Sequence, residues 1–551
     1  MDLEGQRCVL REVRTNENTI RFHGVGHLMI IMRTEFRSPL TLALIVALFV
    51  PPISQSFADR ALSVREYGAK GDGATKDTAA IQKAIDAAAK QGGGTIHFPP
   101  GRYVSGTIHL KSRISVDIGP GASVMLSPEK ADFDSYEKLD YDSHADNETT
   151  YAHHALFMAD GESDISIYGF GEIDGNRSKR GGPKPIAFKN CKNVAVQNIR
   201  IVNAPNYCIS LLGCDYARID GVTIRHAFAD GIDPDCSRYV QISNCTVESN
   251  DDAVCLKTSL ALGKRLPTEH VAVTNCILSS SSNNFKMGTE SSGDFRDIGL
   301  SNCTMFRRSG DKDNSGIAIE SVDGSNINGV VVSNVSMSNV HNPIFIRLGN
   351  RGRGLNPPVP GTLRNISING IIATGAEMTT SITGLAGHPV QDVHLENIRI
   401  NMAGGGTKSP IIDVPEAPAK YPESNMFGEL PAHGMYARHA ANLTVRDLRI
   451  DCEKFDGRPA IVFDDVLLGS LKDVVFASGN HETPVLRFRN SVGITVQGCA
   501  ARGAPPVFLS IEGKNSEGIS LIGNGLKFVK AVVQAGREVP RSVVTQILNQ
   551  R

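Results

Sequence analysis

Three aspartates in two short segments are the residues of this sequence best suited to acid–base chemistry. Asp230 opens the segment Asp-Gly-Ile-Asp, and Asp251 and Asp252 stand side by side 21 residues later (251 − 230 = 21). Neighbouring carboxylates repel each other, and partial burial adds to this effect, so we expect at least one raised pKa. A protonated carboxyl beside ionised ones is what glycosidic hydrolysis needs, because one group protonates the leaving oxygen while another activates water.

A structural role is the alternative for each of these residues. Aspartates often cap turns and stack on one another in repeat proteins, and for a single aspartate that role is the more common one. Three aspartates at this spacing, just before the longest insertions of the chain, favour the functional interpretation instead.

The spacing of 21 residues matters because the chain repeats. A short alternating strand that ends in Asn, Gly or Asp returns from residue 193 onward, and the turn residues of its first copies lie 23, 23, 31 and 27 residues apart. These turn residues are Asn198, Gly221, Asn244, Asn275 and Asn302. A basic period of 22 to 25 residues with insertions is typical of a solenoid whose coils each carry about three short strands. Leucine-rich repeats share the period but would show a fixed leucine scaffold, which is not visible.

The sequence therefore predicts an all-β fold, a right-handed parallel β-helix with an N-terminal capping helix. Neighbouring coils would lie about 4.8 Å apart, so Asp230 and Asp251 are expected at equivalent points of adjacent coils. Asp252 would then face the core, unless the backbone bends or Asp252 joins a satisfied polar cluster. Asn and Gly suit the bends because both tolerate left-handed backbone angles. Insertions on one side of such a solenoid are expected to form a binding groove.

The sequence is predicted to divide into three segments. Residues 1–58 are expected to be a leader that contains a signal peptide, with translation starting at Met32, a basic region, the apolar run Leu40–Val50 and a cleavage site before Asp59. Residues 59–535 would form the single β-helix, capped by a helix from about Thr78 to Gln91. Residues 536–551 would be a frayed tail. A long leader or a membrane anchor is the alternative to the signal peptide.

Composition and cysteines limit the partners. Basic and acidic residues number 57 and 58, so no overall field attracts nucleic acid or an anionic membrane. The chain has 11 cysteines, of which ten remain after residue 58. Their recurrence after Asn at matching repeat positions suits a ladder of buried free thiols as well as it suits disulfides. No Cys or His spacing indicates a metal, and no cofactor is predicted.

Four stretches of the sequence resemble the polygalacturonases, glycoside hydrolase family 28 of the pectate-lyase-like β-helix superfamily. Residues 64–73 resemble the opening of that superfamily. Asp230–Asp233 is similar to the family's Asn-Thr-Asp-Gly-x-Asp motif, Asp251–Asp252 to its Asp-Asp motif, and residues 287–293 to the segment after its Gly-His-Gly. The resemblance implies an inverting glycosidase acting on a pectin-type polysaccharide. It also implies that Asp251 protonates the glycosidic oxygen while Asp230 and Asp252 activate water.

Two departures from the family pattern affect the expected substrate. Ser282-Asn283-Asn284 stands in place of Gly-His-Gly, so the histidine that tunes the acid is missing, and Phe345-Ile346-Arg347 stands in place of Arg-Ile-Lys. We therefore expect either ordinary polygalacturonate cleavage or, as the alternative, action on rhamnogalacturonan or exo action.

Five charged residues are expected to bind the sugar. The basic ones would hold a uronate carboxylate and the acidic ones would contact the substrate, with solvated edge charges as the alternative for the lysines. They are Arg347, Lys257, Lys286, Glu290 and Asp233. The stretch Met426–Gly434 is expected to be a packed loop, with closure of one end of the groove as the alternative.

Two other classes fit the same fold. A calcium-dependent pectate lyase would use Asp230, Asp233 and Asp251 as oxygen ligands. A non-catalytic carbohydrate-binding β-helix would use no acid at all. We expect a monomeric, secreted or periplasmic protein with a polysaccharide as its partner and no stable membrane span after cleavage of the signal peptide.

Overall fold

The computed structural model describes residues 61–308, 310, 314–407, 413–476 and 483–550, together with two short strands near the N-terminus. These strands, β1 (Val13–Thr15) and β2 (Asn18–Ile20), pair antiparallel. Contacts divide the chain into Met1–Ala58 and Asp59–Arg551. Most of the predicted leader, including its apolar run and cleavage site, lies outside the described residues. None of the described helices is both long and apolar enough to cross a membrane.

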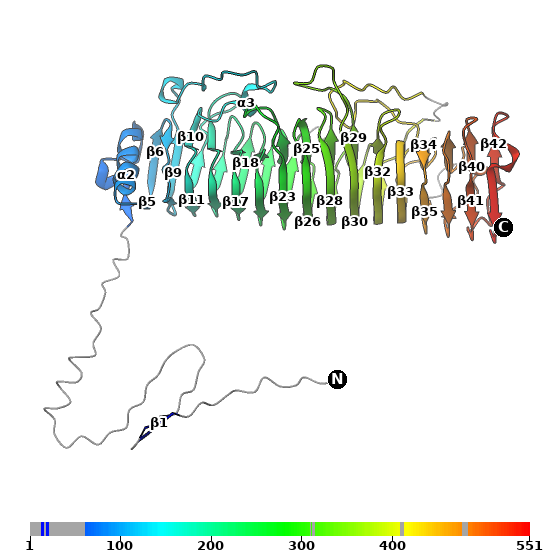
Figure 1. Cartoon of the computed structure of the whole chain (residues 1–551), viewed down its shortest axis with the longest axis horizontal. Helices are drawn as coiled ribbons and strands as arrows, with labels where there is room; N and C mark the ends of the chain where they lie inside the picture. The colour runs from blue at the N-terminus through cyan, green and yellow to red at the C-terminus, as the bar shows by residue number, and fades with distance from the viewer. Residues whose placement is uncertain are drawn as a thin grey trace. The chain divides into compact units, whose positions relative to one another are not determined.

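The second unit is a parallel β-helix, as predicted, whose coils stack along one axis (Figure 1). Each regular coil contributes one strand to each of three parallel ladders. The first ladder, which we call the site sheet, contains β7 (Ile108–His109), β10 (Ala155–Asp160), β13 (Lys184–Lys189), β16 (Ile209–Leu212), β19 (Ile232–Asp235), β22 (Val254–Thr258), β25 (Asn283–Ser291), β27 (Ser315–Ser321), β29 (Asn342–Leu348), β31 (Thr380–Thr383), the start of β33 (Met435–Cys452), β34 (Ile461–Leu467), β37 (Leu486–Arg489), β40 (Val507–Glu512) and β42 (Ala531–Ala535).

The other two ladders complete the coils. The second contains β3 (Leu62–Ser63), β5 (Gly94–Phe98), β8 (Ile114–Ile118), β11 (Ser163–Gly169), β14 (Lys192–Gln197), β17 (Asp215–Asp220), β20 (Arg238–Ser243), β23 (Thr268–Thr274), β26 (Phe295–Phe306), β28 (Asn326–Ser338), β30 (Thr362–Ala376), β32 (Val390–Met402), part of β33, β35 (Ser470–Lys472), β38 (Thr495–Gln497), β41 (Ile519–Ile522) and β43 (Val544–Ile547). The third contains β4 (Asp72–Lys76), β6 (Gly101–Ser105), β9 (Ala122–Leu126), β12 (Glu172–Asp174), β15 (Arg200–Val202), β18 (Thr223–Ala227), β21 (Thr246–Ser249), β24 (Ile277–Ser280), the ends of β26, β28, β30, β32 and β33, β36 (Val475–Phe476) and β39 (Ala500–Ala501).

Aliphatic side chains stacked from coil to coil form the core. Ile219 pairs in register with Ile242, which pairs with Val273 and then Leu300, and all four are buried. Each such side chain contributes about 1.5–3 kcal/mol when fully buried. Buried and more exposed residues alternate along strands of the second ladder such as β17 and β20, as the repeat phrase encodes.

The bends between strands use the residues that the repeat marks. The φ angles of Asn198, Asn244, Asn275 and Asn302 are 59°, 57°, 55° and 53°, so these asparagines adopt the left-handed conformation that the sequence predicts for the bends.

The cysteines that follow the repeat asparagines are buried in the core. All ten cysteines from Cys191 to Cys499 are free, which decides for the thiol ladder over disulfides.

A helix lies at the N-terminal end of the coils (Figure 1). Helix α2 (Thr78–Lys90) buries Ile81, Ala84, Ile85 and Ala88 against the core, which accounts for the spacing of these residues. Asp77 makes no side-chain cap to the helix; its carboxylate instead accepts hydrogen bonds from the Lys70 and Gly71 amides.

The end of the β-helix differs from the prediction of a frayed tail over residues 536–551. Val544–Ile547 form β43, which pairs in parallel with β41 and extends the second ladder. The prediction of a tail is wrong because residues 544–547 continue the strand pairing of the preceding coil, although the sequence phrase is degenerate there.

Two segments between strands lie on one side of the coils, over the outer face of the site sheet (Figure 1). One contains the short helix α3 (Asn147–Thr150), whose first turn is capped by Asp146. The other, residues 413–434 between β32 and β33, we call the cover loop. Ser424 of this loop donates to the Asn314 carbonyl, and Met426 packs on Ala318 and Phe345 of β27 and β29.

Candidate active site

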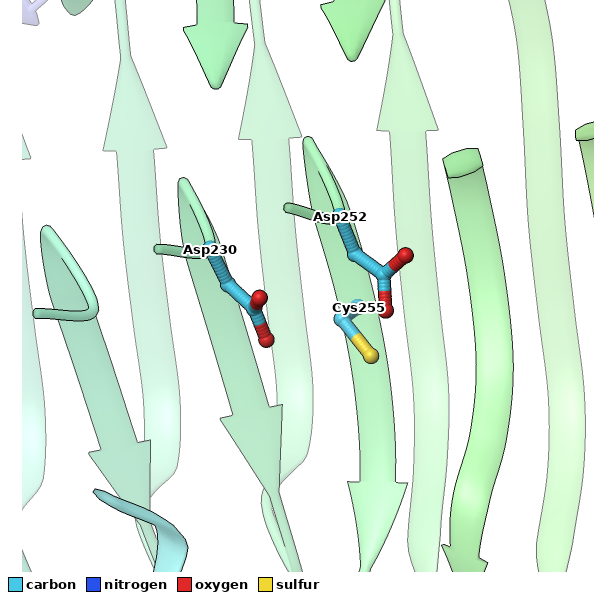
Figure 2. Close-up of side chains that lie close together, drawn as sticks. All are labelled: Asp230, Asp252 and Cys255. Atoms are coloured by element: carbon cyan, nitrogen blue, oxygen red, sulfur yellow. The ribbon is translucent and has the colours of Figure 1, made fainter. Parts of the chain in front are cut away.

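Asp230 and Asp252 occupy equivalent positions on neighbouring coils. Ile232 pairs with Val254, so the step between these coils is 22 residues (254 − 232 = 22) rather than 21. One oxygen of each carboxylate lies within 4.8 Å of the other and of Cys255 Sγ, and Figure 2 shows the three side chains pointing to the same side. The prediction that Asp230 matches Asp251 is thus wrong by one residue, because the turn before β22 is one residue longer than we assumed.

Asp251 projects from the turn between β21 and β22 and is the most accessible of the three aspartates. Its backbone carbonyl accepts hydrogen bonds from Ser249 Oγ and Ser280 Oγ, both at 2.6 Å, which fixes the turn. Its side chain is 28% exposed, and its Oδ2 accepts a 2.5 Å hydrogen bond from Arg180 Nη1. The turn therefore presents one carboxylate to solvent while it directs the next one inward.

Asp252 is buried in a satisfied polar cluster, which is the second of the two outcomes that the sequence left open. Lys286 Nζ lies 3.2 Å from Oδ2, and the backbone and side-chain amides of Asn283 donate to Oδ1 at 3.1 and 2.8 Å. Burial acts to raise the pKa of Asp252, but Lys286, Asn283 and Lys257 outweigh burial and lower it. Asp252 is therefore held ionised, as a general base must be.

Asp230 shares a buried lysine with Asp233. Lys257 Nζ lies 2.8 Å from Asp230 Oδ2 and 2.7 Å from Asp233 Oδ1, and it sits 3.9 Å from the centroid of the Tyr207 ring. Burial raises the pKa of Asp230 well above its usual value, and repulsion by Asp233 adds to this effect while Lys257 opposes it. One ammonium thus serves two carboxyls, and Asp230 retains a proton more readily than Asp252 does.

The five residues predicted to bind the sugar form ion pairs or hydrogen bonds with other groups of the protein. Lys257 and Lys286 are each 3% exposed and neutralise the aspartates described above. Asp233 is 2% exposed beside Lys257, and Glu290 pairs with Arg353 at 3.0 Å. The site thus uses both lysines to set the charge of its own carboxyls.

Arg347 is the largest departure from the predicted sugar contacts. It is 2% exposed and donates to the carbonyls of Gly384, Glu416 and Ala417 at 3.2, 2.7 and 3.3 Å. The Phe427 ring lies 5.2 Å from its guanidinium carbon. Arg347 anchors the cover loop, and this geometry is at odds with a direct contact to a uronate.

The structure adds residues that the sequence reasoning missed. Glu320 on β27 is fully buried, neither of its carboxyl oxygens has a hydrogen-bond partner among the described residues, and burial raises its pKa to about 8. Tyr421 lies on the cover loop, with its ring centroid 5.5 Å from Lys286 Nζ. The repeat offered no signal for Tyr421 or for Arg180, because both lie in insertions.

The same cluster can be tested as a metal site. Asp230, Asp252 and Cys255 are close enough to share an ion. A thiol must lose its proton to bind a metal, however, and burial raises the pKa of Cys255 well above its usual value. Lys257 Nζ also stands between Asp230 and Asp233, where the lyase alternative would need Ca²⁺. The donor set therefore suits a lysine-neutralised acid cluster better than it suits a cation site.

The chain is similar in sequence and fold to known proteins. The chain is 22% identical over 377 residues to a probable polygalacturonase of Vitis vinifera, which covers 63% of this chain and 76% of that protein. It is 25% identical over 308 residues to an endo-polygalacturonase of Pectobacterium carotovorum subsp. carotovorum, covering 50% of this chain and 73% of that protein. Among solved structures, the exopolygalacturonase of Thermotoga maritima superposes with a TM-score of 0.55 at 22% identity, covering 62% of this chain and 87% of that one.

The family model gives the assignment. Its match extends over residues 123–420, more than half of the chain, and includes Asp230, Asp251 and Asp252. The chain therefore belongs to glycosyl hydrolases family 28.

Proposed function

We propose that this glycoside hydrolase cleaves a pectin-type polysaccharide with inversion of configuration, using Asp251 as general acid and Asp252 as general base. The observation that carries the proposal is the contrast between the two adjacent aspartates. Asp251 is accessible, while Asp252 is buried and held ionised by Lys286 and Asn283. An acid that must reach a glycosidic oxygen and a base that must stay charged require these different surroundings.

Asp230 has a supporting part in this scheme. It lies beside Asp252 on the same side of the sheet (Figure 2), and because its raised pKa lets it retain its own proton, it is less available than Asp252 to accept the proton of the attacking water. We assign it the orientation of that water, with Asp252 accepting the proton. This assignment refines the sequence-based one, in which both residues activated water equally.

The substrate class rests on the relatives. Those reported above are named polygalacturonases, of both endo and exo type. A polymer that contains galacturonate is therefore the first substrate to test, and rhamnogalacturonan is the second.

The test is a screen of the purified protein on homogalacturonan, rhamnogalacturonan and xylogalacturonan, with the products identified by chromatography and anomeric NMR. We expect products of inverted configuration from at least one polymer. Asp251→Asn and Asp252→Asn should each lose about 10²- to 10⁴-fold in kcat while oligosaccharide binding persists. Retained configuration would overturn the mechanism, and an unsaturated, UV-absorbing product would establish a lyase instead.

The cover loop favours exo action. Tyr421 and Met426 place the chain's own residues over Lys286, Ala318 and Phe345, so the outer face of the site sheet is covered next to the aspartates. A polymer crossing that face would have to pass over the cover loop. We therefore propose that the substrate is attacked at a chain end.

Product size over time distinguishes the two modes of attack. Exo action should release only monomers or dimers from the first minutes onward, while the viscosity of the polymer falls slowly. A ladder of intermediate oligomers with an early drop in viscosity would show endo action.

Export and oligomeric state remain predictions. The apolar run Leu40–Val50 behind basic residues supports export through a signal peptide. N-terminal sequencing of the mature protein checks the cleavage before Asp59, and sedimentation analysis checks the predicted monomer.

A further inference from the structure

Arg180 bridges two carboxylates from different parts of the chain, Glu148 of α3 and Asp251 of the turn between β21 and β22. Its Nε donates to both carboxylate oxygens of Glu148 at 3.0 Å, and its Nη2 also donates to Glu148. Its Nη1 donates to Asp251 at 2.5 Å. Glu148 thus holds the guanidinium by several hydrogen bonds while Asp251 holds it by one. The bond to Asp251 is therefore the one that can be exchanged.

Arg180 is much more exposed than the three basic residues predicted to bind the sugar. Its side chain is 43% exposed, whereas Lys257, Lys286 and Arg347 are each at most 3% exposed and bound to protein groups. A uronate approaching Asp251 thus meets the Arg180 guanidinium as an accessible cation. Planar bidentate pairing with a carboxylate is the geometry that arginine favours.

The ion pair between Arg180 and Asp251 is incompatible with proton donation by Asp251. A general acid must carry a proton, and a neutral carboxyl cannot form the ion pair that a carboxylate forms with a guanidinium. Asp251 can act as the acid only after Arg180 has turned to another anion.

We propose that Arg180 binds the carboxylate of the substrate's uronate and, in doing so, releases Asp251 to take up a proton from solvent. This inference rests on the proposed function. Before binding, Arg180, Glu148 and Asp251 carry one net negative formal charge. After the sugar carboxylate has replaced Asp251 and Asp251 has been protonated, the group again carries one net negative charge. Binding of the anionic sugar is thereby coupled to uptake of one proton, so the uronate itself activates the acid.

Kinetics on two matched substrates test the specificity. For Arg180→Ala, KM for an oligogalacturonate should rise about 10- to 100-fold, the loss expected for a charge-assisted hydrogen-bonded pair, while KM for its methyl ester should stay within about 2-fold. Lys179→Ala removes an exposed positive charge from the same loop and is the control, with about 2-fold change or less on either substrate. An equal effect of Arg180→Ala on both substrates, or no effect on either, would overturn the proposal.

Calorimetry tests the coupling. Titration of the full-length protein with digalacturonate in two buffers of different ionisation enthalpy should show net proton uptake, and the dimethyl ester should show none. Proton uptake that is absent with digalacturonate, or that persists in Arg180→Ala, would refute the exchange. If the unmodified enzyme cleaves no pectic polymer, the proposed function fails and this inference fails with it. Failure of the Arg180 tests alone leaves the proposed function intact.

Discussion

Asn283 donates its side-chain amide to Asp252 Oδ1 at 2.8 Å, from the position where the related Gly-His-Gly motif has its histidine. The backbone amide of Asn283 donates to the same oxygen at 3.1 Å. The residue that appeared from the sequence only as a missing histidine is thus a hydrogen-bond partner of Asp252, the proposed base. It replaces a titratable group by a neutral donor, so the site depends on Lys286 and Asn283 to keep Asp252 charged.

Asn283→Ala should therefore weaken the base. Loss of the hydrogen bond from the Asn283 side chain removes one of the groups that lower the pKa of Asp252. The acid limb of the kcat/KM profile should therefore move to higher pH. We expect kcat at the optimum to fall about 10-fold, which corresponds to roughly 1.4 kcal/mol. Asn326→Ala is a matched control, since its amide donates to Asp294 at 3.1 Å on the exposed surface. An unchanged acid limb in Asn283→Ala would contradict the role of this amide.

Lys257→Met should destabilise the fold more than it affects sugar binding. Removing the ammonium leaves Asp230 and Asp233 buried without a counter-charge, which costs about 3–5 kcal/mol. Urea denaturation measures this loss. The double variant Lys257→Met/Asp233→Asn should recover part of it, because one of the two carboxylates is then neutral. If the second substitution adds a further loss instead, the shared-lysine description is wrong.

Glu320→Gln should change how stability depends on pH. The pKa of Glu320 is raised from 4.5 to about 8, chiefly by burial, with Asp252 and Glu423 also raising it while Lys286 and Arg351 oppose this. The folded protein therefore binds this proton more tightly than the unfolded chain does. The resulting stability is fully present below pH 4.5 and is lost as the pH rises through about 8.

Melting temperatures measured across this pH range provide the test. The Tm of the unmodified protein should fall as the pH rises, and the Tm of Glu320→Gln should fall less. Glu517→Gln, an exposed position, should follow the unmodified protein. Parallel curves for the unmodified protein and Glu320→Gln would show that Glu320 titrates normally.

The repeat made the coils predictable, and the insertions limited what could be said of the site. Asn244 and Asn275 mark bends because a left-handed residue must recur once per coil, and the alternation around Ile219 and Ile242 reveals the core strands. These constraints are local and periodic, so one sequence displays them many times.

The partners of the aspartates are set by tertiary contacts instead. Arg180 reaches Asp251 across 71 residues of sequence, and Arg347 reaches Ala417 across 70. Neither contact has a period, so sequence alone could not distinguish the exposed Arg180 from the buried Arg347. The one-residue error in matching Asp230 to Asp251 has a similar origin, since the strand repeat does not encode the length of the turn before β22.

Arg347→Lys should loosen the cover loop. A lysine has the charge but lacks the planar fork that donates to the carbonyls of Gly384, Glu416 and Ala417, so at least one carbonyl would lose its donor. We expect a loss of about 2 kcal/mol in unfolding free energy and faster trypsin cleavage after Lys420, which lies in the loop. If the loop also enforces attack at chain ends, longer oligomers should appear among the products. Arg364→Lys, at an exposed strand position, should leave the protease pattern and the products unchanged. A variant that loses stability yet resists trypsin and keeps its product sizes would show that Arg347 stabilises the coils without anchoring the loop.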